Sequence, residues 1–245
     1  MRKTKWGRLV LRLLDRPIWV YLAYARMDRV RVRMLSHAAY YLTPSGPEGA
    51  LTTTFSKVVL SRPTRTFVDV GANIGSYTWT FLTLIPDGQV ISIEPDPSSL
   101  HLLRATANRW GRSVEIHGAA LSNEAGSAYF GMASFDGHRS SLQPVPGDDV
   151  IVVRTLRLDD VVGHRQVDIV KIDVEGHEAQ VLGGAQETIA RSKPCLIVEC
   201  FHEPPNCLEP IRQLGYELFD GEQGGRANER TSNYLALPTD ARPVA

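Results

Sequence analysis

The sequence is poor in cysteine, and its few cysteines are not arranged for cross-linking or for zinc. Only three of 245 residues are cysteines, Cys195, Cys200 and Cys207, and no two of them have the CxxC spacing. Three cysteines cannot all pair within one chain, and structural zinc sites need paired ligand spacings. We therefore expect a protein of a reducing compartment, the cytoplasm.

Long apolar runs are missing as well. The most apolar stretch lies near the N-terminus, where Arg12, Asp15 and Arg16 interrupt it well short of the roughly 18 residues of a membrane span. No small-residue cleavage site follows a clean apolar core, so a signal peptide is not expected. The stretch predicts an amphipathic helix instead.

Two common nucleotide motifs are absent. The chain has no Gly-x-x-x-x-Gly-Lys-Ser/Thr, which excludes a P-loop, and no Gly-x-Gly-x-x-Gly, which disfavours a dinucleotide site. No tyrosine has a lysine four positions further on. An NAD(P)-dependent, sugar-modifying oxidoreductase, which would want such a Tyr-x-x-x-Lys pair, is therefore kept only as an alternative.

The net charge is zero, but the charges are unevenly distributed. Residues 1–40 carry ten Lys or Arg and two Asp, a net of +8, which leaves −8 on the remainder. The Pro- and Gly-rich segment 43–49 marks a boundary. We predict a basic amphipathic helical arm over residues 1–49 and one α/β domain over residues 50–245. The arm could contact an anionic membrane surface, a second subunit of a homodimer, or the domain itself. A non-catalytic nucleic-acid-binding module is a further alternative, which the acidic body disfavours.

Beyond this boundary, apolar strand-like runs alternate with helix-like segments, as in a parallel sheet with helical crossovers. Two further strand-like pieces near the C-terminus have no helix between them and predict an antiparallel hairpin. The expected strands are 66–70, 89–94, 114–117, 168–173, 196–200, 216–219 and 234–237. The expected helices are 76–84, 97–110 and 179–192.

Residues 67–77 read Phe-Val-Asp-Val-Gly-Ala-Asn-Ile-Gly-Ser-Tyr, and a second strand ends in Glu94. This strand, glycine turn and helix predict a nucleotide pocket, with Glu94 accepting hydrogen bonds from the ribose hydroxyls. Asn73 replaces the middle glycine of dinucleotide sites, and Asp69 would repel a phosphate. A cofactor with cationic groups, S-adenosylmethionine, fits these residues better.

Five motifs in order resemble the FkbM family of class I O-methyltransferases. They are residues 67–75, Ser-Ile-Glu-Pro-Asp-Pro (92–97), Ala-Ala-Leu-Ser-Asn (119–123), Lys-Ile-Asp-Val-Glu-Gly-His-Glu (171–178) and Ile-Val-Glu-Cys-Phe-His (197–202). The resemblance runs from about residue 65 to 237 and leaves the arm uncovered. It implies a Rossmann-like, mostly parallel seven-stranded sheet ending in an antiparallel hairpin, with helices on both faces.

The same resemblance implies a cofactor site. The residues lining it would be Asp69, Gly71, Asn73 and Gly75 at the methionine end, Glu94, Pro95 and Asp96 at the ribose, and Ala120, Leu121 and Ser122 beside the adenine. For the last three, an ordinary exit from a strand into a loop is the alternative. Asp173 would face the cofactor's ammonium or the acceptor hydroxyl.

Acidic clusters follow two apolar strands, and charges at such positions are costly unless they are used or paired. We predict Asp173, Glu175, Glu199 and His202 as the catalytic group, with His202 as general base or as a structural histidine. His177 ranks below His202 because its position varies in the family motif. Glu178 is expected to cap the next helix or to add a negative charge to its first turn.

A divalent cation is left open. Asp173, Glu199 and His202 would be the ligands if Mg²⁺ or Mn²⁺ binds, but carboxylates equally suit sugar hydroxyls. The polar segment 133–149 is expected to be a substrate loop or an exposed insert. The sequence thus predicts methylation of a hydroxyl, on a sugar of a glycolipid, polysaccharide or glycosylated natural product.

Overall fold

The fold is built around one seven-stranded sheet. The computed structural model describes residues 14–23, 25–44, 46, 48–110, 114–132, 141–143, 149–200 and 208–239. The strands are β3 (Thr66–Val70), β4 (Gln89–Ile93), β5 (Val114–His117), β9 (Ile169–Ile172), β10 (Cys195–Glu199), β11 (Tyr216–Asp220) and β12 (Asn233–Pro238). They lie in the order β11-β12-β10-β9-β3-β4-β5. Only β12 runs antiparallel to its neighbours, so the predicted parallel sheet with a terminal hairpin is confirmed.

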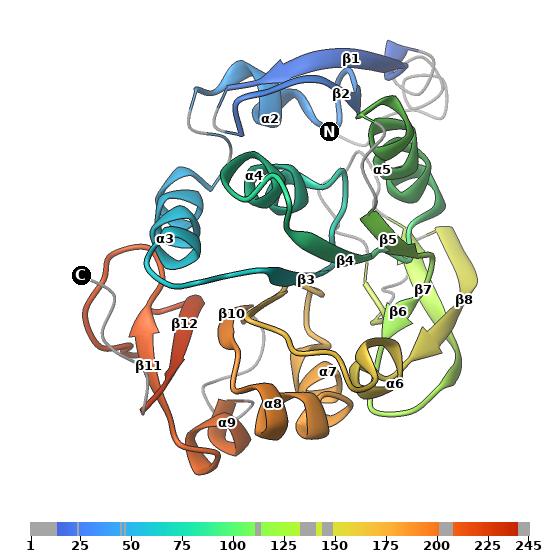
Figure 1. Ribbon diagram of the computed structural model, residues 1–245. Helices are drawn as coiled ribbons and strands as arrows, with labels where there is room; N and C mark the ends of the chain where they lie inside the picture. The colour runs from blue at the N-terminus through green and yellow to red at the C-terminus, as the bar shows by residue number, and fades with distance from the viewer. Residues whose placement is uncertain are drawn as a thin grey trace.

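Helices cover both faces of this sheet, as expected (Figure 1). On one face lie α3 (Gly49–Leu60), α4 (Ser76–Leu84) and α5 (Pro97–Trp110). On the other lie α6 (Leu158–Val162), α7 (Glu178–Gly183), α8 (Gln186–Ser192) and α9 (Glu209–Gln213). The central strands are buried on both sides, which explains why each reads as a continuous apolar run.

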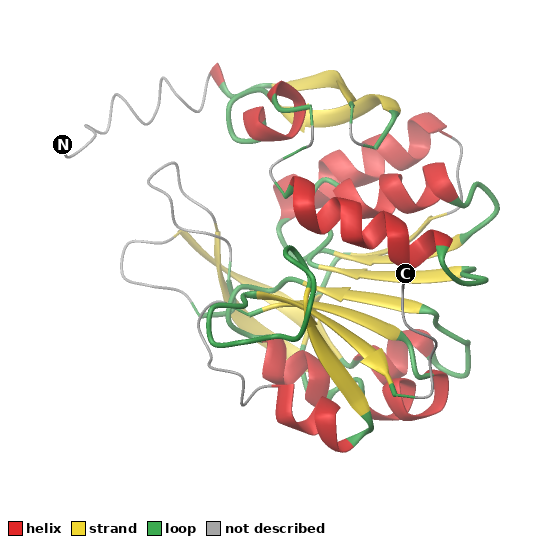
Figure 2. Ribbon diagram, turned by 90° about the vertical axis from the view of Figure 1, so that its left-hand side faces the viewer, coloured by secondary structure: helices red, strands yellow, loops and turns green. Residues whose placement is uncertain are grey.

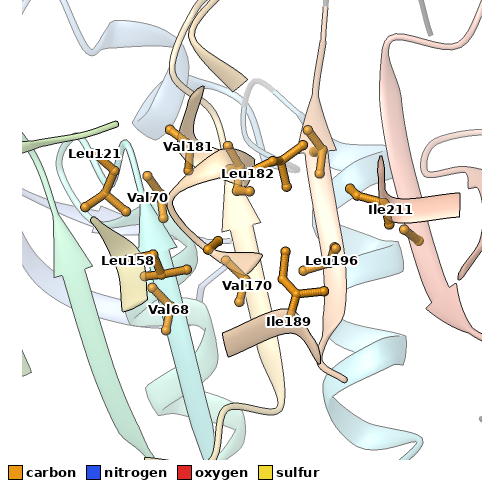
Figure 3. Packing of buried hydrophobic residues seen from close by; sticks show 14 of the residues in the cluster. Val68, Val70, Leu121, Leu158, Val170, Val181, Leu182, Ile189, Leu196 and Ile211 are labelled. Carbon is orange, nitrogen blue, oxygen red and sulfur yellow. The ribbon is translucent and has the colours of Figure 1, made fainter. Parts of the chain in front are cut away.

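One core lies between the sheet and α7 and α8. Val68, Val170 and Leu196 point from neighbouring strands toward Leu182 and Ile189 (Figure 3). A second core lies on the opposite face and includes Phe55, Phe67 and Trp79 from α3, β3 and α4. The two cores fix the strand ends that carry the polar residues described below.

The single helix predicted over residues 179–192 is wrong, because the chain forms α7 and α8 with a break between them. Consecutive glycines, Gly183 and Gly184, weaken a helix at this point. The chain also passes against another backbone here, since a Cβ on Gly184 would lie 2.1 Å from the carbonyl oxygen of Ser122. The break therefore lets α7 approach the loop that follows β6.

A small three-stranded sheet was not predicted. It consists of β6 (Ala120–Leu121), β7 (Gly126–Met132) and β8 (Asp149–Leu156), in the order β6-β8-β7. In Figure 2 it projects beyond the edge of the main sheet. Most of the predicted substrate loop over residues 133–149 lies outside the described residues, but Ser141, Leu142 and Gln143 are described.

The N-terminal region corrects the prediction of a helical arm. Residues 1–13 lie outside the described residues, but β1 (Pro17–Leu22) and β2 (Met27–Arg33) form an antiparallel hairpin, followed by the short helix α2 (Ala38–Leu42). The more buried residues recur at every second position, Ile18, Val20 and Leu22 in β1 and Val30 and Val32 in β2, a period that favours strand over helix. Ile18, Val20 and Leu22 alternate with the exposed Trp19 and Tyr21.

The hairpin is part of the core of the molecule. It lies over α4 and α5 on the side away from the sheet (Figures 1 and 2). Leu22, Val30 and Val32 are fully buried in the same cluster as Phe55 and Trp79. The part of the arm that the structure describes therefore packs on the domain, which was one of the three expected arrangements.

Two further expectations concern the cysteines and the membrane. Cys195 and Cys200 are buried, whereas Cys207 lies outside the described residues. Burial raises the pKa of the Cys195 thiol to about 12. Among the described residues, no helix is long and apolar enough to cross a membrane.

Candidate active site

A cavity of about 700 Å³ opens at the carboxyl ends of β3, β4, β9 and β10. This size suits a cofactor-sized ligand, and the carboxyl edge is where open α/β sheets bind their ligands. The cavity wall combines residues from these strand ends with residues of the small sheet and of the N-terminal region. Segments distant in sequence therefore meet at one pocket.

The glycine turn after β3 forms part of this wall. Gly71 has φ +77°, and a Cβ there would lie 1.8 Å from the carbonyl oxygen of Asp173. Glycine is thus required for β3 and β9 to end side by side. Asn73, with φ 50°, also lines the cavity. Gly75 does not line it; with φ +88°, its missing Cβ leaves room for Trp79 and Leu103 instead.

Glu94 is buried at the floor of the cavity, at the end of β4. Its two carboxylate oxygens accept separate hydrogen bonds, from the backbone N–H of Asn73 at 2.7 Å and that of Asp96 at 2.7 Å. Burial raises the pKa of Glu94 to about 8, against the lowering effect of these two donors. The glycine turn and Glu94, which the sequence predicts to form one pocket, are therefore in direct contact.

The two aspartates predicted near the cofactor have structural partners. Asp69 is buried and accepts hydrogen bonds from the backbone N–H and the hydroxyl of Thr78 in α4, at 3.1 and 2.6 Å. Asp96 caps α5 by accepting the backbone N–H of Ser98 at 2.7 Å. Asp69, Asp96 and Pro95 nevertheless line the cavity.

The segment 120–122, predicted to flank the adenine, lines the cavity only in part. Ala120 and Leu121 line the cavity, but Ser122 is absent from its wall. The Ser122 hydroxyl lies 3.1 Å from Nε2 of His177. His177 thus has a polar contact away from the strand ends, in keeping with its low rank as a base.

Three of the four predicted catalytic residues meet at the cavity. Asp173, Glu175 and Glu199 line it, whereas His202 lies outside the described residues. Burial and then the nearby Asp173 raise the pKa of Glu199 to about 8. Glu178 is buried at the first residue of α7 and accepts the backbone N–H of Gly176, which precedes the helix, at 2.9 Å. It therefore places an acidic group in the first turn of α7, as one of the two expectations for it had it, but does not cap the helix.

Three residues beside this acidic group were not predicted from the sequence. Lys171 is buried in β9, with Nζ 2.8 Å from Asp173 and 4.6 Å above the ring of Tyr77. The Tyr77 hydroxyl donates to Glu48 at 2.6 Å. Burial alone would lower the pKa of Lys171, but Asp173, Glu48 and Asp69 raise it well above its usual value. The sequence signal that could have identified Lys171 was a lysine inside an otherwise apolar strand.

The carboxylates converge closely enough to consider a cation. Oxygens of Glu48, Asp173 and Glu199 lie within 4.8 Å of one another. Asp173 and Glu199 belong to the predicted ligand set, whereas Glu48 does not. The third predicted ligand, His202, lies outside the described residues. Such oxygens suit Mg²⁺ or Mn²⁺, yet Lys171 already supplies a positive charge to Asp173. Binding of a divalent cation by these carboxylates therefore stays a prediction.

The described part of the predicted substrate loop reaches the same region. The Ser141 hydroxyl donates to the carbonyl oxygen of Glu175 at 3.0 Å, and Nε2 of Gln143 donates to that of Gly176 at 2.6 Å. Leu142, between them, lines the cavity. These contacts attach the loop to the segment after β9.

Comparisons with known proteins agree with this geometry. The model of the FkbM methyltransferase domain matches residues 69–218, more than half of the chain. The 2-O-methyltransferase NoeI of Sinorhizobium fredii is 30% identical over 154 residues, covering 55% of this chain and 63% of NoeI. The hexuronic acid methyltransferase AglP of Haloferax volcanii is 28% identical over 134 residues, covering 54% of each protein. The chain thus spans less than two thirds of these relatives.

A solved structure resembles the fold. The methyltransferase FkbM from Methylobacillus flagellatus superimposes with a TM-score of 0.53 and 18% identity, over 77% of this chain and 52% of that one. This similarity concerns the fold alone. The matching domain gives no support to the oxidoreductase or nucleic-acid-binding alternatives. With the glycine turn and Glu94 at one cavity and the matched domain running from Asp69 into β11, this chain belongs to the FkbM methyltransferase family.

Proposed function

We propose that the protein is an S-adenosylmethionine-dependent O-methyltransferase that methylates a hydroxyl of a sugar, in a glycolipid, polysaccharide or glycosylated natural product. The observation that carries this proposal is Glu94, a buried carboxylate fixed by the glycine turn at the floor of the cavity. Both of its oxygens retain acceptor capacity for the two ribose hydroxyls of the cofactor. S-adenosylmethionine supplies an electrophilic methyl group when it is bound.

The chain's own residues suit the remaining steps. The acidic wall around Asp173 favours the sulfonium and ammonium charges of the cofactor. Methyl transfer also requires an aligned acceptor and a group that takes the hydroxyl proton. Glu199, with its raised pKa, and Asp173 line the cavity and are our candidates for that proton. His202 remains a proposed base outside the described residues.

The acceptor class is supported by the relatives. One is a 2-O-methyltransferase and another acts on a hexuronic acid, so a carbohydrate acceptor is consistent with both. The carboxylates that line the cavity are common partners of hydroxyl groups.

Transfer of label from methyl-tritiated S-adenosylmethionine to a panel of methyl glycosides tests the proposal. We expect labelled glycosides that resist alkaline hydrolysis, because methyl ethers are stable to base and methyl esters are not. Glu94→Ala should reduce the labelling, since it removes the ribose acceptor. Cofactor binding without labelling of any glycoside would refute the sugar acceptor, and alkali-labile label would refute ether formation. Adding EDTA to the assay tests the cation: undiminished labelling would refute a need for Mg²⁺ or Mn²⁺.

We also propose that the N-terminal region contacts an anionic membrane surface. The supporting observation is the outward face of the hairpin, where Trp19 and Tyr21 are exposed and Arg31 lies 5.2 Å from the Trp19 ring. Aromatic side chains and arginines together suit a lipid interface. The double variant Trp19→Ser, Tyr21→Ser should bind phosphatidylglycerol vesicles more weakly than the wild type. Equal binding would contradict this contact.

A further inference from the structure

The N-terminal region supplies a wall of the cavity that the family match does not include. His37, Tyr40, Glu48 and Thr52 line the cavity, whereas the matched domain begins at Asp69. This wall therefore lies outside the residues that the family match covers. It is a natural location for groups that select the acceptor.

Glu48 is the charged residue that this wall brings nearest to the candidate catalytic carboxylates. One of its oxygens accepts the hydroxyl proton of Tyr77 at 2.6 Å. Burial and then Glu48 raise the pKa of Tyr77 well above its usual value, so Tyr77 stays protonated and donates this bond. The tyrosine thus holds the Glu48 carboxylate within 4.8 Å of the oxygens of Asp173 and Glu199.

Carboxyl groups outnumber lysines and arginines among the described residues that line the cavity. Among the described residues that line it, Lys171 is the one lysine or arginine, and its ammonium is already paired with Asp173 at 2.8 Å. Glu48, Glu175 and Glu199 add carboxyl groups to the same wall. Hydroxyl and ammonium groups donate hydrogen bonds to carboxylates, whereas a carboxylate or phosphate on the acceptor would be repelled.

We infer that Glu48 is an acceptor-binding residue and that, with Asp173, it selects neutral or amino-bearing sugars over sugar acids and sugar phosphates. This inference rests on the proposed function and narrows its substrate class. It also separates the chain from its hexuronic acid-methylating relative. Tyr77 is a positioning residue, because it acts through Glu48.

The experiment compares three probes that share one ring: methyl β-D-glucoside, methyl β-D-glucosaminide and methyl β-D-glucuronide. Methyl transfer is measured for the wild type, Glu48→Gln, Tyr77→Phe and the matched control Glu217→Gln. Glu217 lies on β11 outside the cavity wall and is partly exposed beside Arg226. Binding of S-adenosylhomocysteine, measured by calorimetry, reports folding and cofactor affinity for each variant.

For the wild type we expect kcat/KM on the glucoside and glucosaminide to exceed that on the glucuronide by roughly tenfold or more. This is the size of effect that the loss of one hydrogen bond to a charged group produces. Glu48→Gln should raise KM for the glucoside by roughly tenfold. Its S-adenosylhomocysteine affinity should stay unchanged. Tyr77→Phe should act in the same direction but less strongly, and Glu217→Gln should match the wild type.

Equal rates on the glucuronide and the glucoside would overturn the charge selection and leave sugar methylation standing. An unchanged KM in Glu48→Gln would overturn the role of Glu48. A Glu48→Gln protein that loses S-adenosylhomocysteine affinity would assign the residue to the cofactor instead. Wild-type protein that binds the cofactor but methylates none of the probes would overturn this inference together with the sugar acceptor of the proposed function.

Discussion

Gly71 links the glycine turn to the end of β9, because its backbone lies against that of Asp173. A methyl group there would overlap the Asp173 carbonyl oxygen at 1.8 Å and would sit on a residue with φ +77°. We expect Gly71→Ala to cost about 3 kcal/mol or more of unfolding free energy and to abolish cofactor binding. Chemical denaturation and calorimetry measure the two effects.

Gly224→Ala is the matched control for this variant. Gly224 has a similar φ of +74°, but a Cβ there has nothing within 4 Å. We expect only the cost of backbone strain, about 1 kcal/mol, with cofactor binding intact. Equal losses in the two variants would show that the contact with Asp173 is unimportant.

We expect Glu94 to give cofactor binding a pH dependence. Its pKa of about 8 means that the carboxyl is largely protonated in the unliganded protein at neutral pH. Ribose hydroxyls that donate to Glu94 favour the ionised form, so binding should release a proton. Affinity should therefore rise with pH up to about 8 and then level off. Calorimetry in buffers of different ionisation enthalpy measures the released proton, and Glu94→Gln should abolish it. Affinity that falls over this range would contradict the role of Glu94.

The N-terminal hairpin has one buried and one exposed face, and opposite substitutions distinguish them. Val32 is fully buried, whereas Trp19 is 42% exposed. Val32→Asp places an unpaired charge in the core and should cost about 3 kcal/mol or prevent folding. Trp19→Asp should cost about 1 kcal/mol or less, through its contact with Arg31. Thermal unfolding measures both, and similar losses would contradict this orientation of the hairpin.

Elements could be predicted from sequence where local signals and packing agree. The strand beginning at Thr66 and the helices beginning at Ser76 and Pro97 were located correctly, because apolar β-rich runs, a glycine turn and a proline at a helix start act locally. The N-terminal hairpin was not predicted, because the expectation of a helix rested on the apolar and basic content of the segment. It did not use the period of two with which the more buried residues recur. The break at Gly184 depends on a backbone contact with Ser122, more than 50 positions away in sequence, which no local pattern reveals.

The candidate site could be predicted in part for the same reason. Glu94, Asp173 and Glu199 stand directly after apolar strands, so the sheet alone brings them to one edge. Glu48 and Tyr77 reach the cavity only through the packing of the N-terminal region and α4 on the sheet. Their partnership is a tertiary contact between segments that carry no shared motif.

At the scale of the whole molecule, one sheet edge collects the glycine turn, the acidic strand ends and the N-terminal wall around a single cavity. Whether two such molecules form the expected homodimer is decided by sedimentation analysis. The central claim is that this cavity binds S-adenosylmethionine through Glu94.

Calorimetric titration with S-adenosylmethionine tests that claim most directly, with NADH as the comparison ligand. We predict saturable binding at one site per chain, weakened by roughly tenfold or more in Glu94→Ala, and no binding of NADH. No binding of S-adenosylmethionine to folded protein, or equal affinity in the Glu94→Ala variant, would contradict the account.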